Sequence, residues 1–225
     1  MKVGFLVNDL QLSGGVGVVV QHVHQLRSRH GFDARLVLVR EQDDPHWAHH
    51  TLEGIPVESL ATAREQPWDI AIGTWWETAF SLFELDAARH AMFVQSLEDR
   101  FYGADEAERV TAGLVLDLPV AFITEARWIR DTLAELRPDA RCHLVRNGMD
   151  KEVFAGPAEI VPRLREPLRV LVEGNPSSWF KHVGAAVEAA GTMAEPRHLT
   201  VVSGERAAFA HAGIDRLVGP VSQRE

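Results

Sequence analysis

The opening stretch, residues 1–30, constrains the fold most, because a short apolar run, a glycine-bearing loop and a long apolar-patterned segment follow one another there. Residues 3–7 are apolar and are bounded by Asn8 and Asp9, which is typical of a buried parallel strand. The pattern from about residue 16 to residue 30 predicts a helix. A strand followed directly by a helix indicates a βα unit of a parallel sheet.

The loop between this strand and this helix contains Ser13, Gly14, Gly15 and Gly17. Because glycine carries no side chain, the backbone N–H groups here can approach a ligand closely. The same groups lie at a helix N-terminus, where the helix dipole favours an anion. One interpretation is a phosphate cradle, and the other is a tight strand-to-helix turn that binds nothing.

Composition and charge narrow the classes of protein that this chain can belong to. Its 225 residues suffice for one large domain or two small ones, and a formal net charge of -9 argues against a nucleic-acid partner. Cys142 is the single cysteine, which excludes a disulfide within the chain and a multi-cysteine metal site. It also fits a reducing compartment.

Membrane and secretion signals are weak in this sequence. Residues 112–123 form the best candidate for a membrane span, but Asp117 and Pro119 interrupt them. The first apolar run is too short for a signal peptide. We therefore expect a cytoplasmic protein, and peripheral contact with a membrane stays open.

Strands and helices are expected to alternate along the first two thirds of the chain. A polar stretch with two prolines, residues 41–58, predicts a loop or an edge hairpin. The tetrapeptide Thr74 to Glu77 matches a capping box and predicts the start of a helix that runs to about Arg89. Further strands are expected at residues 34–39, 69–73, 91–95, 119–124 and 143–145, and further helices at residues 104–116 and 125–136.

This alternation predicts a parallel sheet with helices on both faces. Ligands of such sheets bind beyond the carboxyl ends of the strands. The candidate ligand-binding segments are therefore the polar and aromatic stretches that follow the strands, namely residues 8–17, 74–77, 95–102, 124–127 and 146–150.

A second α/β domain is expected after a linker. Residues 155–167 carry three prolines and mixed charges, which is typical of a linker, so the first domain is assigned to residues 1–154. The strand–helix pattern restarts in residues 168–225, with a helix expected at residues 181–194. Strands are expected at residues 168–173, 198–202 and 217–218. Because three strands make a poor independent core, we expect this domain to be truncated or completed elsewhere.

The order of these features resembles the retaining glycosyltransferases of the GT-B fold, in particular the large family-4 group. The resemblance rests on the glycine-rich first loop, the Asn147-Gly148-Met149-Asp150 segment, the proline-bearing linker and the Gly174 to Lys181 stretch. Two further pieces, GTWWETA at residues 73–79 and FVQSLEDRFY at residues 93–102, look more narrowly like its rhamnan- and polysaccharide-building branch.

The resemblance implies two Rossmann-like domains, the first holding the acceptor and the second, incomplete here, holding a nucleotide-sugar. Gly14, Gly15 and Gly17 would then lie against the donor phosphates, and Lys181 would pair with the diphosphate. Asn175 stands where the family commonly has an arginine. A cation and helix N-termini can stabilise a departing diphosphate without a metal, so neither a metal nor a cofactor is expected. No catalytic residue is assigned.

The acceptor would be a saccharide, a lipid-linked sugar or a small molecule. Residues that follow the strands of the first domain are the candidates to bind it: Trp75, Trp76, Gln95, Glu98, Tyr102 and Asn147. Each has a structural alternative. Gln95 and Glu98 fit an ordinary polar loop, the two tryptophans fit the core, and Asn147 together with Arg146 fits a hinge.

Other polar residues favour structural explanations. Glu77 is interpreted as a helix cap rather than as an acid or base. The histidines of residues 46–50 lie in a polar loop without a cysteine, which favours solvent exposure over a metal site. His22 and His24 lie on the first predicted helix, and a catalytic role for either is the minor alternative.

Two other functions remain open at this stage. A nicotinamide- or flavin-dependent oxidoreductase fits the first loop poorly, because Val20 stands where a third glycine is expected. A non-catalytic module that binds a sugar or a nucleotide-sugar fits the short second domain. The interpretation that we adopt is a glycosyltransferase.

Overall fold

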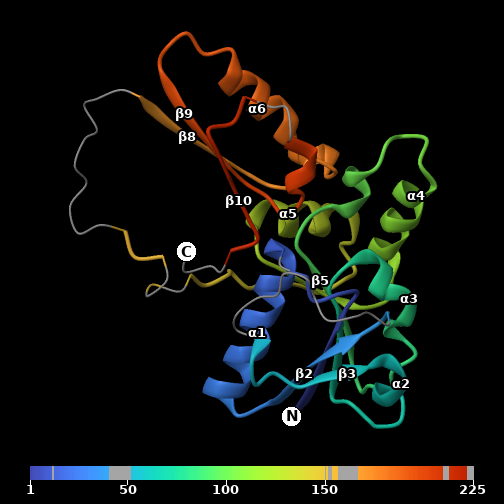
Figure 1. Ribbon diagram of the computed structural model, residues 1–225. Helices are drawn as coiled ribbons and strands as arrows, with labels where there is room; N and C mark the ends of the chain where they lie inside the picture. The colour runs from blue at the N-terminus through green and yellow to red at the C-terminus, as the bar shows by residue number, and fades with distance from the viewer. Residues whose placement is uncertain are drawn as a thin grey trace. The chain divides into compact units, whose positions relative to one another are not determined.

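A computed structural model of the chain describes residues 1–11, 13–40, 52–149, 151, 154–156, 167–209 and 213–221. The chain divides into two compact units, Met1–Met149 and Asp150–Glu225, each drawn in Figure 1. Most of the expected linker, residues 155–167, falls outside the described residues, so its assignment stays a prediction.

The first unit is built on a seven-stranded sheet in which every strand pair is parallel (Figure 1). Its spatial order is β3-β2-β1-β4-β5-β6-β7, so the chain first moves outward from β1 in one direction and then in the other. The strands are β1 (Lys2–Val7), β2 (Asp33–Leu38), β3 (Val57–Ser59), β4 (Ile70–Gly73), β5 (His90–Val94), β6 (Ala121–Thr124) and β7 (Cys142–Leu144).

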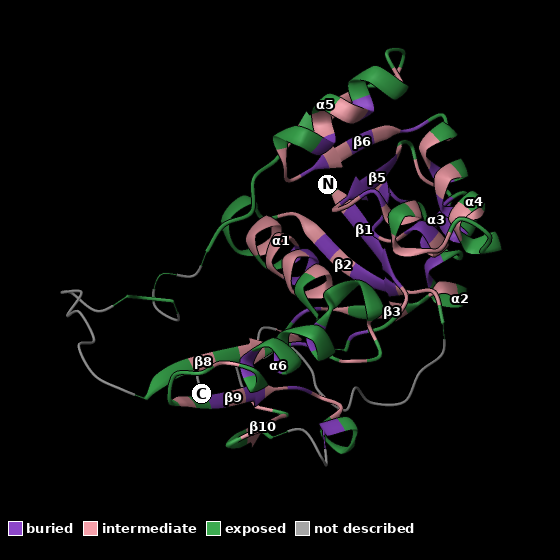
Figure 2. Cartoon of the chain, turned by 90° about the horizontal axis from the view of Figure 1, so that it is seen from above, coloured by how far each residue is buried: buried purple, intermediate pink, exposed green. Residues whose placement is uncertain are grey.

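Alternate residues of a strand point to opposite faces of the sheet. Apolar side chains lie on both faces of this sheet, and helices cover both. On β5, Phe93 packs in the core cluster of α1 (Gly14–His30), whereas Met92 and Val94 pack in the opposite cluster with α4 (Ala107–Leu114) and α5 (Arg127–Leu136). Figure 2 shows the buried residues concentrated on the central strands. Shorter elements complete this unit: α2 (Leu60–Ala63), η2 (Trp76–Thr78), α3 (Ala79–Leu82), η3 (Glu98–Phe101) and η4 (Val115–Asp117).

Helix α1 begins at Gly14, two residues earlier than predicted. Ser13 is its N-cap, and the Ser13 hydroxyl accepts a hydrogen bond from the Val16 N–H at 3.2 Å. The glycines that the sequence placed in a loop therefore belong to the first turn of the helix. The helix ends at Gly31, which adopts a left-handed φ of 65° that glycine tolerates.

The edge of the sheet differs from the prediction for residues 41–58. Strand β3 pairs in parallel with β2, with Leu36 opposite Val57, so this part is not a hairpin. The short helix α2 follows, with the Ser59 hydroxyl accepting from the Thr62 N–H at 3.1 Å. Residues 41–51 lie outside the described part of the chain.

The helix predicted for residues 74–89 ends at Leu82, and long-range pairing is the physical reason. The Trp68 N–H donates to the Asp86 carbonyl at 2.8 Å, and the Ala88 N–H donates to the Trp68 carbonyl at 3.0 Å. Residues after Leu82 therefore form an isolated parallel bridge with Trp68 instead of continuing the helix. The expected capping box is also wrong, because the Thr74 hydroxyl donates to the Leu6 carbonyl at 2.7 Å.

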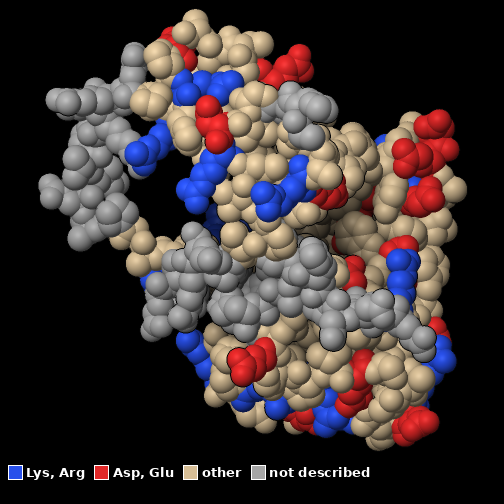
Figure 3. Space-filling model, in the orientation of Figure 1, with Lys and Arg blue, Asp and Glu red and all other residues tan. Residues whose placement is uncertain are grey.

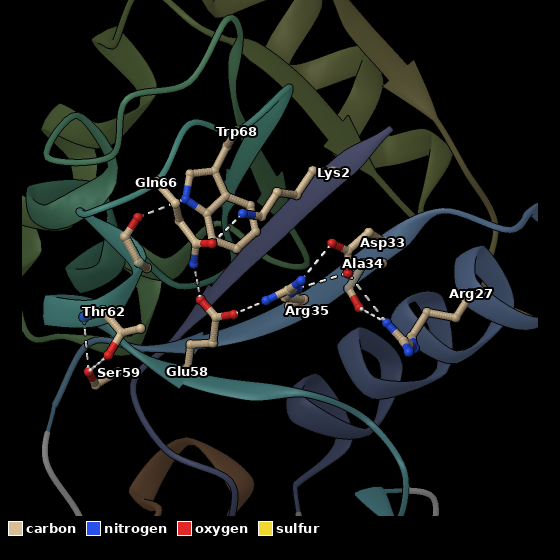
Figure 4. Close-up of polar contacts among 11 residues, drawn as sticks. Lys2, Arg27, Asp33, Ala34, Arg35, Glu58, Ser59, Thr62, Gln66 and Trp68 are labelled. Carbon is tan, nitrogen blue, oxygen red and sulfur yellow. Dashed lines mark hydrogen bonds and ion pairs between the residues drawn. The ribbon is translucent and has the colours of Figure 1, made fainter.

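A polar network closes the amino-terminal ends of the first strands (Figure 4). The Glu58 carboxylate accepts from Arg35 and from Gln66, and the Gln66 amide oxygen accepts from Lys2. Arg35 also donates to Asp33, and this bond lowers the pKa of the Asp33 carboxyl. The network links β1, β2 and β3 at the edge opposite to the carboxyl ends of the strands.

The second unit has a three-stranded parallel sheet of order β10-β9-β8. Its strands are β8 (Leu168–Glu173), β9 (Arg197–Val202) and β10 (Arg216–Val218), with α6 (Val183–Gly191), η5 (Trp179–Lys181) and η6 (Arg206–Phe209). Its core contains Val183, Leu199, Val201 and Phe209. The expected fold class, an α/β chain with two Rossmann-like parallel sheets of which the second is smaller, is confirmed.

Candidate functional site

The order of the strands reverses between β1 and β4, so their carboxyl ends form the topological switch point of the first sheet. Ligands of open parallel sheets bind beyond such a point. The buried Thr74 hydroxyl bonds the Leu6 carbonyl across the two strands and fixes the loops that follow them. Residues after β1, β2, β4 and β5 meet in the polar contacts described next.

Glu77 occupies the centre of these contacts. Its carboxylate accepts from Asn8 Nδ2, and it accepts from Arg40 Nη2 at 2.5 Å. Glu77 therefore bonds residues that follow β1 and β2, and its expected role as a helix cap is wrong. We refer to Asn8, Arg40, Glu77 and Glu98 as the switch-point cluster.

Glu98 belongs to this cluster because the charge of Glu77 acts on its carboxyl group. The pKa of Glu98 is raised to about 8, mainly by burial and in part by the charge of Glu77, while a hydrogen bond from the Trp76 backbone opposes this shift. That bond joins the Trp76 N–H to Glu98 Oε2 at 2.6 Å. At neutral pH Glu98 is consequently a carboxylic acid that can donate a proton as well as accept hydrogen bonds.

The cluster leaves one buried atom without a partner. Asn8 Oδ1 accepts no hydrogen bond from the residues that the structure describes. An unpaired buried oxygen is costly, and a ligand or a water that donates to it would remove this cost.

The aromatic candidates form two pairs, Trp76 with Tyr102 and Trp75 with Phe101. Trp76 is buried, and its indole Nε1 donates to the Tyr102 hydroxyl at 2.9 Å. Burial raises the pKa of that hydroxyl. Trp75 is half-buried and stacks on Phe101, with ring centroids 5.9 Å apart and an interplanar angle of 14°. Of the two tryptophans, Trp75 is the more exposed.

Gln95 contacts the glycine-bearing turn rather than the switch-point cluster. Its Nε2 donates to the Gly15 carbonyl at 3.3 Å. A Cβ atom at Gly15 would lie 3.4 Å from the same Nε2, which is close to an ordinary van der Waals distance. At Gly14 a Cβ atom would meet nothing within 4 Å. Packing among the described residues therefore requires glycine at neither Gly14 nor Gly15.

Asn147 forms a second polar group at the same edge of the sheet. Its Nδ2 donates to the Glu125 carboxylate, which follows β6. Both residues influence His22 on α1, whose pKa is lowered mainly by burial, while Asn147 and Glu125 oppose this shift. His22 packs edge-on against Phe93, with ring centroids 5.3 Å apart. The sequence did not single out Glu125, because its partner follows another strand.

Asn175 and Lys181 lie in the loops of the second unit. Asn175 Oδ1 accepts from the Ser203 hydroxyl at 3.0 Å and from the Gly204 N–H at 3.1 Å, so it joins the loops after β8 and β9. Lys181 is exposed at the end of η5, and α6 begins after His182. The expectation that Lys181 starts a helix is therefore wrong.

Two negative findings apply to the described residues only. No group of three or more His, Cys, Asp or Glu side chains among them could hold a metal ion. Likewise, none of the helices that the structure describes is long and apolar enough to cross a membrane. The histidines of residues 46–50 lie outside the described part.

Acidic and basic side chains are interspersed on the face of the first unit seen in Figure 3.

Comparisons with known proteins identify the fold. No protein-family model matches the sequence, and no curated protein matches it significantly. Among solved structures, the chain is similar to the apo form of the lipopolysaccharide outer core galactosyltransferase WaaB, with 14% sequence identity and a TM-score of 0.53. The match covers 97% of this chain and 67% of that chain. Together with the two parallel sheets, this likeness supports the expected GT-B fold.

Proposed function

We propose that this protein is a glycosyltransferase that moves a sugar from a nucleotide-sugar to a saccharide, lipid-linked or small-molecule acceptor. The observation that carries the proposal is the switch-point cluster, with the half-buried Trp75 in the same loop as Glu77, in a fold that resembles a galactosyltransferase along nearly the whole chain. Carboxyl, amide and aromatic groups together suit the hydroxyls and the apolar faces of a sugar.

In this proposal the acceptor binds to the first unit. Asn8 Oδ1 and Glu98 offer hydrogen-bond acceptors to sugar hydroxyls, and Trp75 offers a ring face. Trp76 and Tyr102 hold Glu98 and η3 in position through the Trp76 N–H and the indole–hydroxyl bond. Gln95 positions the turn that contains Gly15, and Asn147 positions Glu125.

The donor is proposed to bind through Gly14, Gly15 and Gly17 of the first unit and through Asn175 and Lys181 of the second. Support comes from the N-terminus of α1, which offers backbone N–H groups to an anion and has no acidic residue in its first turn. Lys181 supplies an exposed positive charge in the second unit. Transfer with retention of configuration and without a metal is part of the same proposal.

The direct test mixes the purified protein with UDP-, GDP- or dTDP-sugars and pooled oligosaccharide acceptors. The nucleoside diphosphate that is released is then measured. We expect acceptor-dependent release with at least one donor, reduced at least tenfold by Lys181→Ala with an unchanged circular dichroism spectrum. The matched control is Lys151→Ala, a lysine outside both proposed sites. Tight binding of NAD with no binding of any nucleotide-sugar would instead favour an oxidoreductase.

A further inference from the structure

The segment that leaves the first unit, residues 145–149, is held on it by few contacts. We call it the exit segment, because the first unit ends at Met149. The Val145 N–H donates to the Thr124 carbonyl at 2.8 Å, whereas no backbone hydrogen bond joins residues 146–149 to the described part of the chain. All five residues of the exit segment are exposed. Side-chain contacts therefore decide whether this segment stays on the first unit.

The exit segment contacts two elements of the first unit through polar side chains. Asn147 Nδ2 donates to the carboxylate of Glu125, which follows β6. Asn147 also acts on the ring of His22 on α1 through a hydrogen bond, and Glu125 acts on the same ring through its charge. A Cβ atom on Gly148 would lie 3.7 Å from Gln21 Nε2, so α1 comes close to the backbone there as well. The exit segment thus contacts α1 and the loop after β6.

The position of His22 on α1 suits the neutral ring. Val19, Val20 and Val23 are buried and hold the helix on the sheet. The His22 ring packs edge-on against Phe93 of β5, and its Nε2 is buried without a partner among the described residues. In the charged ring both nitrogens carry a proton, so Nε2 becomes a buried donor without an acceptor from these residues. A buried charge and an unpaired donor are both costly.

The groups that face His22 from other elements do not offset this cost. Phe93 is apolar and Asn147 is neutral, so Glu125 is the charged group that acts on the ring. Burial is the largest effect, and the pKa of His22 is lowered from its ordinary value of 6.5 although Asn147 and Glu125 oppose the shift. The docked arrangement therefore binds a proton less readily than one in which His22 is in water. By linkage, docking is fully stable above pH 6.5 and is weakened as the pH falls below that value.

We propose that His22, Asn147 and Glu125 form a latch that holds the exit segment on α1 while His22 is neutral and releases it when His22 is charged. Release frees the start of the connection to the second unit, whose residues follow Met149 in the chain. A latch needs two arrangements that differ little in free energy, and the lack of backbone bonds from residues 146–149 to the described residues supplies this condition. The latch does not depend on the proposed transferase function.

The test follows a nitroxide label on the exit segment by EPR spectroscopy between pH 5 and pH 8. Met149→Cys places the label at an exposed position, and Cys142→Ser removes the native thiol. We expect the mobile fraction of the label to grow below pH 6.5. The ratio of released to docked segment should rise by about tenfold for each pKa unit by which docking lowers the pKa of His22. NMR titration of the His22 ring in the same protein should show the same midpoint.

The variants separate a latch from a merely structural contact. His22→Gln keeps a polar side chain that cannot become charged, so its label should not respond to pH, and His22→Phe is the second variant if His22→Gln does not fold. Asn147→Ala removes the contacts to Glu125 and His22 and should leave the label mobile at pH 8 as well as at pH 5. His24→Gln, an exposed position on the same helix, is the matched control and should keep the wild-type profile.

Three results would overturn this proposal: a wild-type label whose mobility is the same at pH 5 and pH 8, the wild-type pH response in His22→Gln or His22→Phe, or a label in Asn147→Ala that is as immobile at pH 8 as in the wild type. Trypsin cleavage after Arg146, measured against a reference peptide at each pH, checks the result without a label. Acidification should accelerate this cleavage in the wild type and not in His22→Gln.

Discussion

Replacing Glu98 by glutamine tests the central electrostatic claim about the switch-point cluster. In the folded protein the pKa of Glu98 is raised from 4.5 to about 8, chiefly by burial. The folded state therefore holds the proton more tightly than the unfolded state does between these two values. The contribution of Glu98 to the free energy of unfolding is fully present below pH 4.5 and is lost as the pH rises to 8. The glutamine variant keeps the acceptor for the Trp76 N–H and has no proton to lose.

The size of the effect follows from the difference between 4.5 and about 8. At about 1.4 kcal/mol for each pKa unit, the wild type loses about 5 kcal/mol of unfolding free energy across this range because of Glu98. A loss of this size is a large part of the stability of an ordinary domain. The difference between the wild type and Glu98→Gln isolates this contribution, because all other groups titrate in both proteins.

The assay is urea unfolding at pH values from 4.5 to 9, followed by tryptophan fluorescence. Among the described residues, Trp68, Trp75, Trp76 and Trp128 report on the first unit, and Trp179 lies in the second. Glu98→Gln should become more stable than the wild type as the pH rises, while Glu108→Gln, an exposed residue of α4, should follow the wild type. Parallel pH profiles for the wild type and Glu98→Gln would refute the reasoning.

Two further predictions concern packing and capping. Gly73→Ala places a Cβ atom 2.5 Å from Met92 Sδ and should cost about 1–3 kcal/mol of unfolding free energy, whereas Gly113→Ala on α4, with nothing within 4 Å, should stabilise by about 0.5–1 kcal/mol. Equal effects of the two alanines in urea unfolding would contradict this contrast. Ser13→Ala removes the hydroxyl that caps α1 and should cost about 1 kcal/mol, while Ser13→Asp should retain most of the stability. A lower melting temperature for Ser13→Asp than for Ser13→Ala would show that the cap does not act as described.

The sequence by itself determined the class of fold, because that class depends on local patterns. Apolar runs of strand length followed by helical periodicity define βα units, and each unit can be identified without knowledge of the others. The strand at residues 168–173 was predicted with the bounds that the structure has. Most other strands were predicted within one or two residues, since their apolar runs are bounded by polar residues or prolines.

Local patterns failed where distant residues compete for the same groups. The helix expected from residue 74 stops at Leu82 because backbone groups after it pair with Trp68. Glu77 resembles a capping residue in the sequence, yet its carboxylate bonds Asn8 and Arg40, which are 69 and 37 positions away. A capping motif contains no information about such partners.

The candidate site was therefore only partly accessible from the sequence. The sequence located the segments that follow the strands, and Glu98 and Trp75 were among the residues named there. Only the tertiary structure decided that Glu98 is half-buried within the influence of the Glu77 charge, that Asn8 has a buried oxygen without a partner among the described residues, and that Trp76 packs inside. The reason is that the order of strands in the sheet brings together residues from loops far apart in the chain, and this proximity sets burial and charge.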